Sequence, residues 1–331
     1  MNRMPRQFAV PIPVRVLSVG LARVATTSVT NDSPFFSSNV QSISDCLVKD
    51  SSLEDVSIEQ PSDPSGDSPS HFWTTEYVKK MRSLLGNDVC RKLGIFELPN
   101  DFLLSVVVPV YNEGGTVSSV VDRLTNTGLP MEIILVDDGS QDGTPEALAS
   151  LSSRPHVVVL THSHNRGKGA AIRTGIKHAK GDIVVIQDAD QEYDPSDFRY
   201  LLQPLLAEEA DVAYGTRYGH YDRQLSPWWH QAVNGLISWL ASLAIGIRLS
   251  DVETCYKMVP RRHLIDIQEQ LQESRFGIEI ELTARLARKR LRFTERPIRY
   301  RHRWYDEGKK IGWRDGVSAL RCIMKYGLLR R

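Results

Sequence analysis

The chain has 331 residues, of which 41% are hydrophobic and 24% charged, and its formal net charge is +1 at pH 7. This length suits one large α/β domain with appendages, or two modest domains. The balance of charge is uneven along the chain, because residues 285–331 hold sixteen Lys or Arg against four Asp or Glu. That part is expected to face phosphate, a membrane surface or nucleic acid, or else to be a solvated basic face.

The four cysteines are far apart and none belongs to a Cys-x-x-Cys pair. This pattern disfavours a zinc site and a disulfide framework, and it fits a reducing cytoplasm. No segment has the run of about 18 apolar residues that a membrane-spanning helix needs. We therefore expect a cytoplasmic protein.

Residues 1–70 are predicted to be a disordered extension. The first 30 residues contain four arginines and no acid, like an organelle transit peptide, but their prolines break any long amphipathic helix. Residues 31–70 are rich in Ser, Asp and Pro and too polar to form a core. Residues 71–100 have apolar positions at helical spacing and predict a helical segment that packs before the main domain.

Residues 101–312 alternate predicted strands and helices, which indicates right-handed βαβ crossovers and a mainly parallel sheet. The strands are expected at residues 103–110, 132–136, 157–160, 183–186 and 211–215. Polar residues follow them, and these should share one edge of the sheet, where open α/β sheets bind ligands. They are Asn112, Glu113, Asp137, Asp138, Asp188 and Asp190.

Asp188 and Asp190 come directly after the buried run of residues 183–186. Two carboxylates so close repel each other unless a cation lies between them, and a hard divalent ion with oxygen ligands is the natural counter-charge. In the alternative interpretation, one aspartate caps the helix that begins near Pro195 and the other is a solvated turn residue. The Gly-x-Gly-x-x-Gly and P-loop patterns are missing, which disfavours a dinucleotide dehydrogenase and a P-loop kinase.

Several motifs, in this order and spacing, resemble those of a known family. They are VPVYNE at 108–113, VDDGS at 136–140, NRGKG at 165–169, DAD at 188–190 and GTR at 215–217. Together they resemble the inverting family-two glycosyltransferases of the GT-A fold, and among these the dolichyl-phosphate or polyprenyl-phosphate mannose and glucose synthases. The likeness covers roughly residues 103–315. It implies a GT-A type α/β fold with a mainly parallel, Rossmann-like sheet flanked by helices.

The resemblance also implies roles at a donor site for a GDP- or UDP-hexose. Asp188 and Asp190 would hold Mg²⁺ or Mn²⁺ on the donor diphosphate, with Asp190 also counted as catalytic. Relatives of the mannose synthase type carry a glutamine that can join the metal where this chain has Glu192, so this acid is a third candidate ligand. The residues implied to contact the nucleotide are Pro109, Tyr111, Glu113, Asp137, Lys168 and Asp188.

Two arginines are implied to act on the acceptor phosphate. Arg217 matches an arginine that contacts this phosphate, and Arg303 resembles the arginine of a C-terminal loop that closes over donor and acceptor. A guanidinium binds phosphate through two parallel hydrogen bonds, which a lysine cannot do. An ordinary salt bridge is the alternative for Arg217. A further arginine of the relatives is not evident, since His230 and Gln231 occupy its region.

The main functional hypothesis is transfer of mannose or glucose, with inversion, from a nucleoside-diphosphate sugar to a polyprenyl or dolichyl phosphate. The alternative is transfer to a hydroxyl of a saccharide or small molecule, for which Asp251 or Glu253 would be the general base. A catalytically silent nucleotide-sugar-binding subunit is disfavoured because both metal aspartates are present. Nucleic-acid binding is disfavoured because the aromatics near the basic tail form no stacking motif.

Two segments bear on contact with a membrane, and we expect the protein to be peripheral at its cytoplasmic face. Residues 228–247 are too short to cross a bilayer and predict either a core helix or an interfacial helix, with Leu236, Leu240, Leu243 and Ile247 on one face. Residues 313–331 predict a basic amphipathic helix that either lies on an anionic membrane or packs on the domain. Its apolar face would contain Trp313, Val317, Leu320, Met324 and Leu328.

Overall fold

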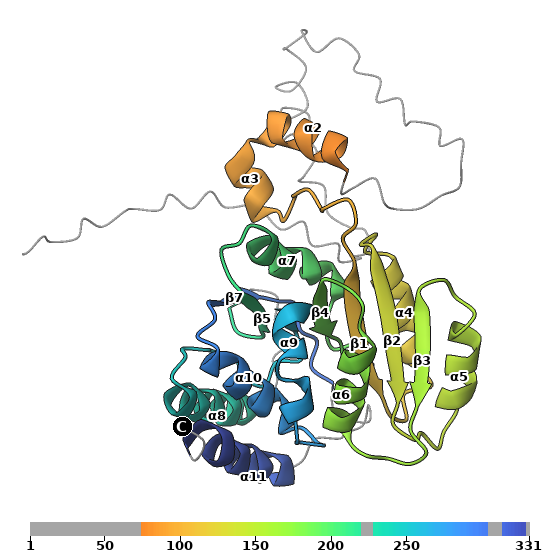
Figure 1. Ribbon diagram of the computed structural model, residues 1–331, viewed down its shortest axis with the longest axis vertical. Coiled ribbons are helices and arrows are strands. Elements are labelled where there is room, and N and C mark those ends of the chain that lie inside the picture. The colour runs from red at the N-terminus through yellow and green to blue at the C-terminus, as the bar shows by residue number, and fades with distance from the viewer. Residues whose placement is uncertain (1–73, 220–227, 304–312, 329–331) are drawn as a thin grey trace, which may run out of the picture. The chain divides into compact units, whose positions relative to one another are not determined.

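The computed structural model describes residues 74–219, 228–303 and 313–328. In these ranges the centre of the molecule is a seven-stranded sheet with the order β3-β2-β1-β4-β6-β5-β7 (Figure 1). The strands are β1 Leu104–Val110, β2 Met131–Asp137, β3 Val157–Thr161, β4 Ile183–Ile186, β5 Val212–Thr216, β6 Lys257–Pro260 and β7 Phe293–Pro297. Strand β6 is antiparallel to β4 and β5, and the other pairs are parallel. The predicted mainly parallel α/β class is confirmed.

The central strands are built from apolar runs because helices cover both faces of the sheet. Every residue of β2 and β4 is buried, which is the pattern of a doubly covered parallel strand. Helix α6 (Lys168–His178) lies on β1 and β2. A Cβ at its Gly175 would lie only 2.3 Å from Cγ1 of Val107, so this position needs a residue without a side chain.

The remaining helices follow the strands in the predicted alternation. Helix α7 packs on β5, β6 and β7, whereas α4 and α5 pack on each other and α5 on β2 and β3. The helices and helical turns are α4 Val117–Thr125, α5 Thr144–Leu151, η2 Pro195–Asp197, α7 Phe198–Leu206, α8 Trp228–Ile245, α9 Arg261–Ile265, η3 Gln268–Gln270, α10 Ile278–Arg288, α11 Trp313–Cys322 and the π-helix η5 Ile323–Leu328.

Two short helices, α2 (Thr75–Leu85) and α3 (Asn87–Lys92), precede the sheet, and each buries one side chain, Val78 and Cys90. The predicted bounds of the N-terminal helical segment (71–100), the main domain (101–312) and the C-terminal helix (313–331) stay predictions. The predicted extension of residues 1–70 lies outside the described residues.

Of the two alternatives for each apolar face of α8, α11 and η5, the structure disfavours core burial for several of the residues, because they are exposed. Helix α8 buries Ile237, Ala241 and Ala244, whereas Leu236 and Leu243 are exposed. Helix α11 and η5 bury Ala319, Cys322, Ile323 and Tyr326, while four residues of the predicted apolar face, Val317, Leu320, Met324 and Leu328, are exposed. Among the described residues, no helix is both long and apolar enough to cross a membrane.

Helix α10 carries a buried ion pair that joins it to the preceding loop. Arg285 donates hydrogen bonds to Oε1 of Glu281 from Nε at 2.9 Å and from a terminal nitrogen at 2.6 Å. The other oxygen of Glu281 accepts the backbone N–H groups of Gln272 and Glu273 at 2.8 and 2.7 Å. Glu281 is fully buried, so removal of its carboxylate would leave the buried guanidinium of Arg285 and two backbone N–H donors without a hydrogen-bond acceptor.

We therefore expect Glu281→Ala to lower the free energy of unfolding by about 3–5 kcal/mol, as measured by urea denaturation. The control is Glu269→Ala, because the side chain of Glu269 is 72% exposed and pairs with Lys177 at the surface. Loss of that exposed pair should cost less than about 1 kcal/mol. Equal effects of the two substitutions would contradict a structural role for the buried pair.

Candidate active site

The carboxyl ends of β1, β2, β4 and β5 meet at one edge of the sheet. Strand β5 has the same direction as β4, because both are antiparallel to β6. Glu113, Asp138, Asp188 and Arg217 lie in the segments that follow these four strands or at their last residues. This edge therefore collects the charged side chains that the sequence placed after separate strands.

Hydrogen bonds fix the loops at this edge to one another. The backbone N–H of Asn112 donates to Oγ of Ser140 at 2.9 Å, and Oδ1 of Asn112 accepts the N–H of Gln141 at 2.9 Å. Asn112 and Gln191 both have left-handed backbone conformations, with φ of 51° and 63°. Such conformations are uncommon for residues other than glycine and need support from the surrounding structure.

Asp138 holds the loop that leads to Lys168. Its carboxylate accepts the backbone N–H groups of Arg166 and Gly167 at 2.9 and 2.6 Å, and Oδ1 lies 2.7 Å from Nδ1 of His162. A Cβ at Gly167 would lie 2.3 Å from the carbonyl oxygen of Ser274, so the loop packs directly on residues before α10. The start of α6 is therefore fixed on both sides.

Lys168 lies between two carboxylates. Its Nζ is 2.7 Å from Oδ1 of Asp188 and 3.3 Å from Oε1 of Glu279. Burial opposes its charged form, yet the facing Asp188 and Glu279 hold the pKa of Lys168 well above its usual value. Lys257 approaches Oε2 of Glu279 to 3.6 Å and donates to two carbonyl oxygens in residues 252–254. These four side chains form a row of alternating charge that is half-buried at Asp188 and Lys168 and buried at Glu279 and Lys257.

The three predicted metal ligands do not form one cluster. In the described ranges, no group of three or more His, Cys, Asp or Glu side chains is placed to hold a metal ion. The carboxylate of Glu192 accepts hydrogen bonds from the hydroxyl group of Tyr300 at 2.8 Å and from the backbone N–H of Arg303 at 2.7 Å. Burial and the neighbouring Asp188 and Glu192 carboxylates raise the pKa of Asp190 well above its usual value. This excess of negative charge on two oxygen-donor side chains, Asp188 and Asp190, fits a divalent cation.

The alternative interpretation, in which one of these aspartates caps the next helix, is not what the structure shows. Asp194 takes that place, because its Oδ1 accepts the N–H of Ser196 at 3.0 Å at the start of η2. Neither Asp188 nor Asp190 is needed for the cap. Asp188 pairs instead with Lys168 at 2.7 Å, whereas Oδ1 of Asp190 accepts the backbone N–H of Glu192 at 3.2 Å and so supports its own turn.

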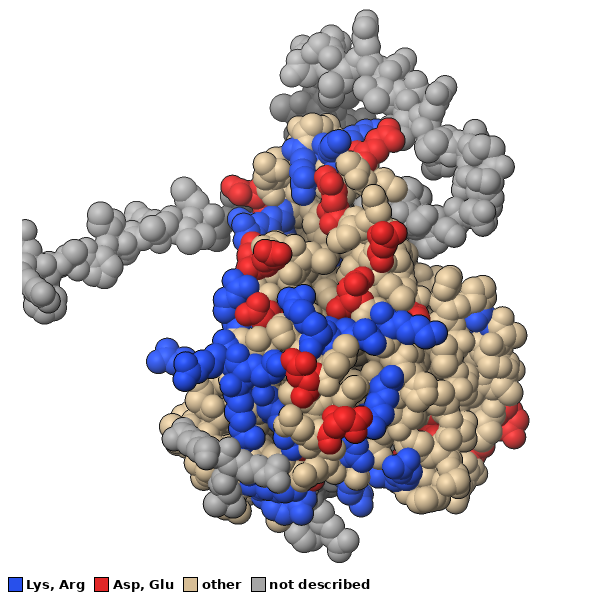
Figure 2. Space-filling view, viewed as in Figure 1, with Lys and Arg blue, Asp and Glu red and all other residues tan. Residues whose placement is uncertain are grey.

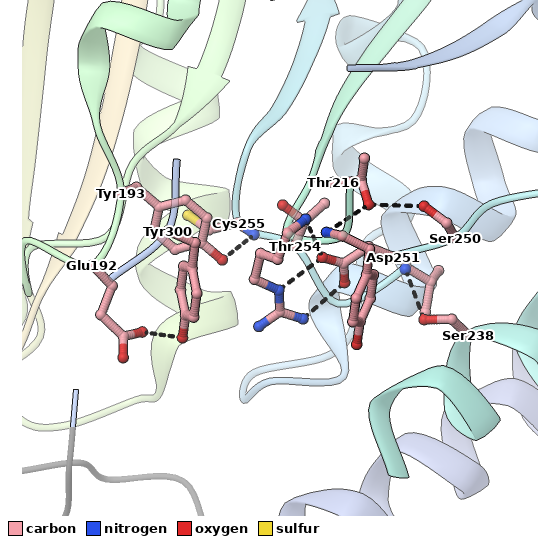
Figure 3. A network of polar contacts seen from close by, with 12 residues as sticks. Glu192, Tyr193, Thr216, Ser238, Ser250, Asp251, Thr254, Cys255 and Tyr300 are labelled. Atoms are coloured by element: carbon pink, nitrogen blue, oxygen red, sulfur yellow. Dashed lines mark hydrogen bonds and ion pairs between the residues drawn. The ribbon is translucent and has the colours of Figure 1, made fainter. Parts of the chain in front are cut away.

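Arg217 is held by Asp251 through two parallel hydrogen bonds of 2.7 Å. Asp251 is fully buried and also accepts the backbone N–H of Arg217 at 3.0 Å. Although burial acts in the opposite direction, the facing guanidinium lowers the pKa of Asp251. Figure 3 shows Asp251 in the turn beside Thr216 and Ser250, whose hydroxyl oxygens are 2.8 Å apart. The salt bridge considered for Arg217 is present, and it orients the guanidinium.

Tyr300 and Arg303 connect this turn with the donor side. The ring of Tyr300 lies 5.4 Å from the guanidinium carbon of Arg217, and its hydroxyl group donates to Glu192 (Figure 3). A terminal nitrogen of Arg303 donates to both oxygens of Glu113, at 3.1 and 3.0 Å. Arg303 therefore bridges the loop after β1 and the loop after β4.

The other predicted site residues are near the same edge. Pro109 pairs with Val136 in β1 and β2, and Tyr111 follows β1. Asp137 ends β2, and its Oδ1 accepts the N–H of Ser140 at 3.0 Å, so it supports its own turn. The roles assigned to these residues stay predictions.

Glu279 is a charged residue of this site that the sequence analysis did not identify. In the described part of the chain neither of its oxygens accepts a hydrogen bond, and both face ammonium groups. The signal was present, since Glu279 and Glu281 interrupt an apolar helical run that otherwise indicates burial.

Comparison with known proteins shows which family the sequence resembles. Residues 105–267 match the model of glycosyl transferase family 2. The chain is 31% identical over 212 residues to the undecaprenyl-phosphate 4-deoxy-4-formamido-L-arabinose transferase of Enterobacter sp. (strain 638). The match spans 62% of this chain and 62% of that relative.

Solved structures show the same fold. Glucosyl-3-phosphoglycerate synthase from Mycobacterium tuberculosis, in complex with Mn²⁺, UDP and glucosyl-3-phosphoglycerate, superposes with a TM-score of 0.53 at 21% identity. The match covers 77% of this chain and 84% of that one. The structure of the same enzyme with Mn²⁺, UDP-glucose and glycerol 3-phosphate gives a TM-score of 0.52 at 21% identity, and the match covers 80% of this chain and 87% of that one. The predicted GT-A type fold is confirmed, and residues 105–267 of the chain match a glycosyl transferase family 2 domain.

Proposed function

We propose that this protein transfers a hexose from a nucleoside-diphosphate sugar to a polyprenyl phosphate, with inversion at the anomeric carbon. The observation that carries this proposal is that the carboxylates Asp188 and Asp190 share a sheet edge with Arg217, a half-buried arginine held by the fully buried Asp251. The likeness to an undecaprenyl-phosphate sugar transferase supports the choice of acceptor. Because such an acceptor is anchored in a bilayer, the protein would work at a membrane surface.

On the donor side, Asp188 and Asp190 would hold Mg²⁺ or Mn²⁺. The ion would neutralise the charge that builds on the leaving nucleoside diphosphate. Lys168 adds a fixed positive charge, since its Nζ is 2.7 Å from Asp188. Pro109, Tyr111 and Asp137 would contact the nucleoside part.

On the acceptor side, Arg217 would bind the phosphate and orient one of its oxygens toward the anomeric carbon. Asp251 uses Nε and one terminal nitrogen of Arg217, so the guanidinium is held in one plane while its other N–H groups are directed elsewhere. The second pKa of a phosphate monoester is about 6, so the acceptor is already anionic at neutral pH and needs no general base. Arg303, which bridges Glu113 and Glu192, would bring the two substrates together.

One observation favours the alternative acceptor, a sugar hydroxyl. Burial raises the pKa of Glu253, and a carboxylate with a raised pKa is a stronger general base. Asp251, the other candidate, is taken by Arg217, which lowers its pKa. If Glu253 acted as a base, activity would rise as pH increases through its raised pKa.

Incubation of the protein with labelled donor sugars and with either polyprenyl phosphate or soluble sugars decides between the two acceptors. We expect transfer to polyprenyl phosphate but not to soluble sugars, and Glu253→Gln should leave this transfer unchanged because an anionic phosphate needs no base. The label is counted in the lipid and in the aqueous products. Transfer only to sugars, lost in Glu253→Gln and increasing with pH in the parent, would establish the alternative instead.

The donor assignment predicts that Asp190→Asn abolishes turnover and weakens donor binding only when Mg²⁺ or Mn²⁺ is present, because an amide lacks the negative charge of the carboxylate. Donor affinity is measured by calorimetry with and without the ion. The control is Asp182→Asn at the opposite end of β4, where Asp182 accepts the N–H of Leu103. An Asp190→Asn protein with normal turnover would remove the metal assignment.

The acceptor assignment predicts that Arg217→Lys weakens the apparent acceptor affinity by about 1–3 kcal/mol and changes donor affinity little. Lysine keeps the charge but cannot bind Asp251 and phosphate through paired hydrogen bonds. Arg292→Lys is the matched control, because Arg292 binds Asp211 in the same two-pronged way at the opposite end of β5. Steady-state kinetics, with donor and acceptor varied in turn, give the KM for each substrate. A change in the KM of the donor alone would mean that Arg217 acts on the donor and not on the acceptor.

A further inference from the structure

Two neighbouring helices expose a row of large apolar side chains. We name this surface the α8–α11 face, and it consists of Val233, Leu236, Trp239 and Leu243 on α8 with Val317, Leu320, Met324 and Leu328 on α11 and η5. Trp239 is 60% exposed and Leu243 is 66% exposed. Eight large apolar side chains exposed on two neighbouring helices are unusual on a soluble protein unless they bind something.

The two halves of this face belong to one packed unit. Helix α8 packs against η5 and α11, and the three elements lie together in Figure 1. The approach is close, because a Cβ at Gly327 would lie 2.7 Å from the Cβ of Ala244. The buried sides of these helices therefore join them, and their apolar outer sides are left toward solvent.

Charged residues lie around the α8–α11 face, but α8 itself contributes none. The 18 residues of α8 include no Asp, Glu, Lys or Arg. Basic side chains lie at its margins, namely Arg248, Arg288, Arg321 and Lys325, and one acid, Glu273, pairs with the last two at 2.9 and 3.0 Å. Figure 2 shows Lys and Arg gathered on the part of the molecule where α10 and α11 lie. Among the residues that the structure describes, this margin thus has four basic residues against one acid.

We propose that the α8–α11 face inserts shallowly into an anionic lipid bilayer. An apolar strip with a tryptophan and a basic margin suits the boundary between acyl chains and anionic headgroups. A second copy of this chain would bring the two basic margins together, which is unfavourable. This inference rests on the proposed function, because only an acceptor with a lipid tail requires docking at a bilayer.

The opposite side of α8 reaches the candidate acceptor site. Oγ of Ser238, which is buried, accepts the backbone N–H of Val252 at 3.1 Å (Figure 3). The adjacent residue is Asp251, which holds Arg217. One turn later, Ser242 exchanges hydrogen bonds with the backbone of Leu249 at 3.0 and 3.1 Å. Helix α8 thus connects the lipid-facing surface directly to the turn that fixes the phosphate-binding arginine.

The test uses the full chain and sedimentation with large vesicles of phosphatidylcholine alone or with a quarter phosphatidylglycerol. We expect binding to the anionic vesicles that weakens as salt is raised. Leu243→Asp and, on the other helix, Met324→Asp should each weaken it by about tenfold or more, since each places a charge where an apolar side chain would be buried. The control is Leu84→Asp on α2, because Leu84 is 68% exposed but lies outside this face.

Circular dichroism confirms that each variant is folded, and light scattering reports its oligomeric state. The inference is overturned if both variants sediment like the parent, or if the parent is a dimer that Leu243→Asp dissociates.

Transfer assays test membrane docking separately from the proposed function. The variants should lose transfer to acceptor embedded in vesicles while keeping transfer to a short-chain, water-soluble polyprenyl phosphate. A parent that transfers to neither acceptor would refute the proposed function, whereas the vesicle binding still decides this inference.

Discussion

The sheet edge that carries the candidate site depends on opposite charges that face each other away from water. Lys168 lies 2.7 Å from Asp188, and Arg217 binds Asp251 at the same distance. Each of these groups would be costly to bury alone, and a pair whose hydrogen bonds are complete removes most of that cost. The same pairing orients cations toward the edge, where an anionic substrate would lie. Fold stability and the arrangement of the site therefore rest on shared contacts.

The strands β1 to β5 could be predicted because each is a local run of apolar residues followed by a helix. Strands β6 and β7 could not be predicted, since the four-residue β6 begins with Lys257 and ends with Pro260, and β7 contains Thr, Glu, Arg and Pro. Helix α8 is apolar around much of its circumference, so its sequence does not indicate which face is buried. Ala319 and Cys322 give weak hydropathy signals, yet they are buried because small side chains allow α11 to approach its neighbours.

Local sequence indicated the sheet edge of these residues better than it indicated the partners of each one. Asp188 and Asp190 were predicted at this edge because they follow the strand of residues 183–186, and Arg217 was singled out by the family resemblance. Their partners come from distant positions, as Asp251 does for Arg217, and such pairs follow from chain topology that no short motif contains. Glu192 illustrates the same limit: it lies beside the two aspartates in sequence, but its carboxylate is directed to Tyr300, 108 residues further along.

Strand β6 affects how the chain is made. It lies between β4 and β5 in the sheet although it is synthesised after both. Until it emerges from the ribosome, β4 has an unpaired edge that can pair wrongly with another chain. Residues 187–256 separate β4 from β6, a length that takes on the order of seconds to translate. The period in which this edge of β4 stays open therefore depends on the length of this intervening segment, which contains α7, β5 and α8, and not on the total length of the protein.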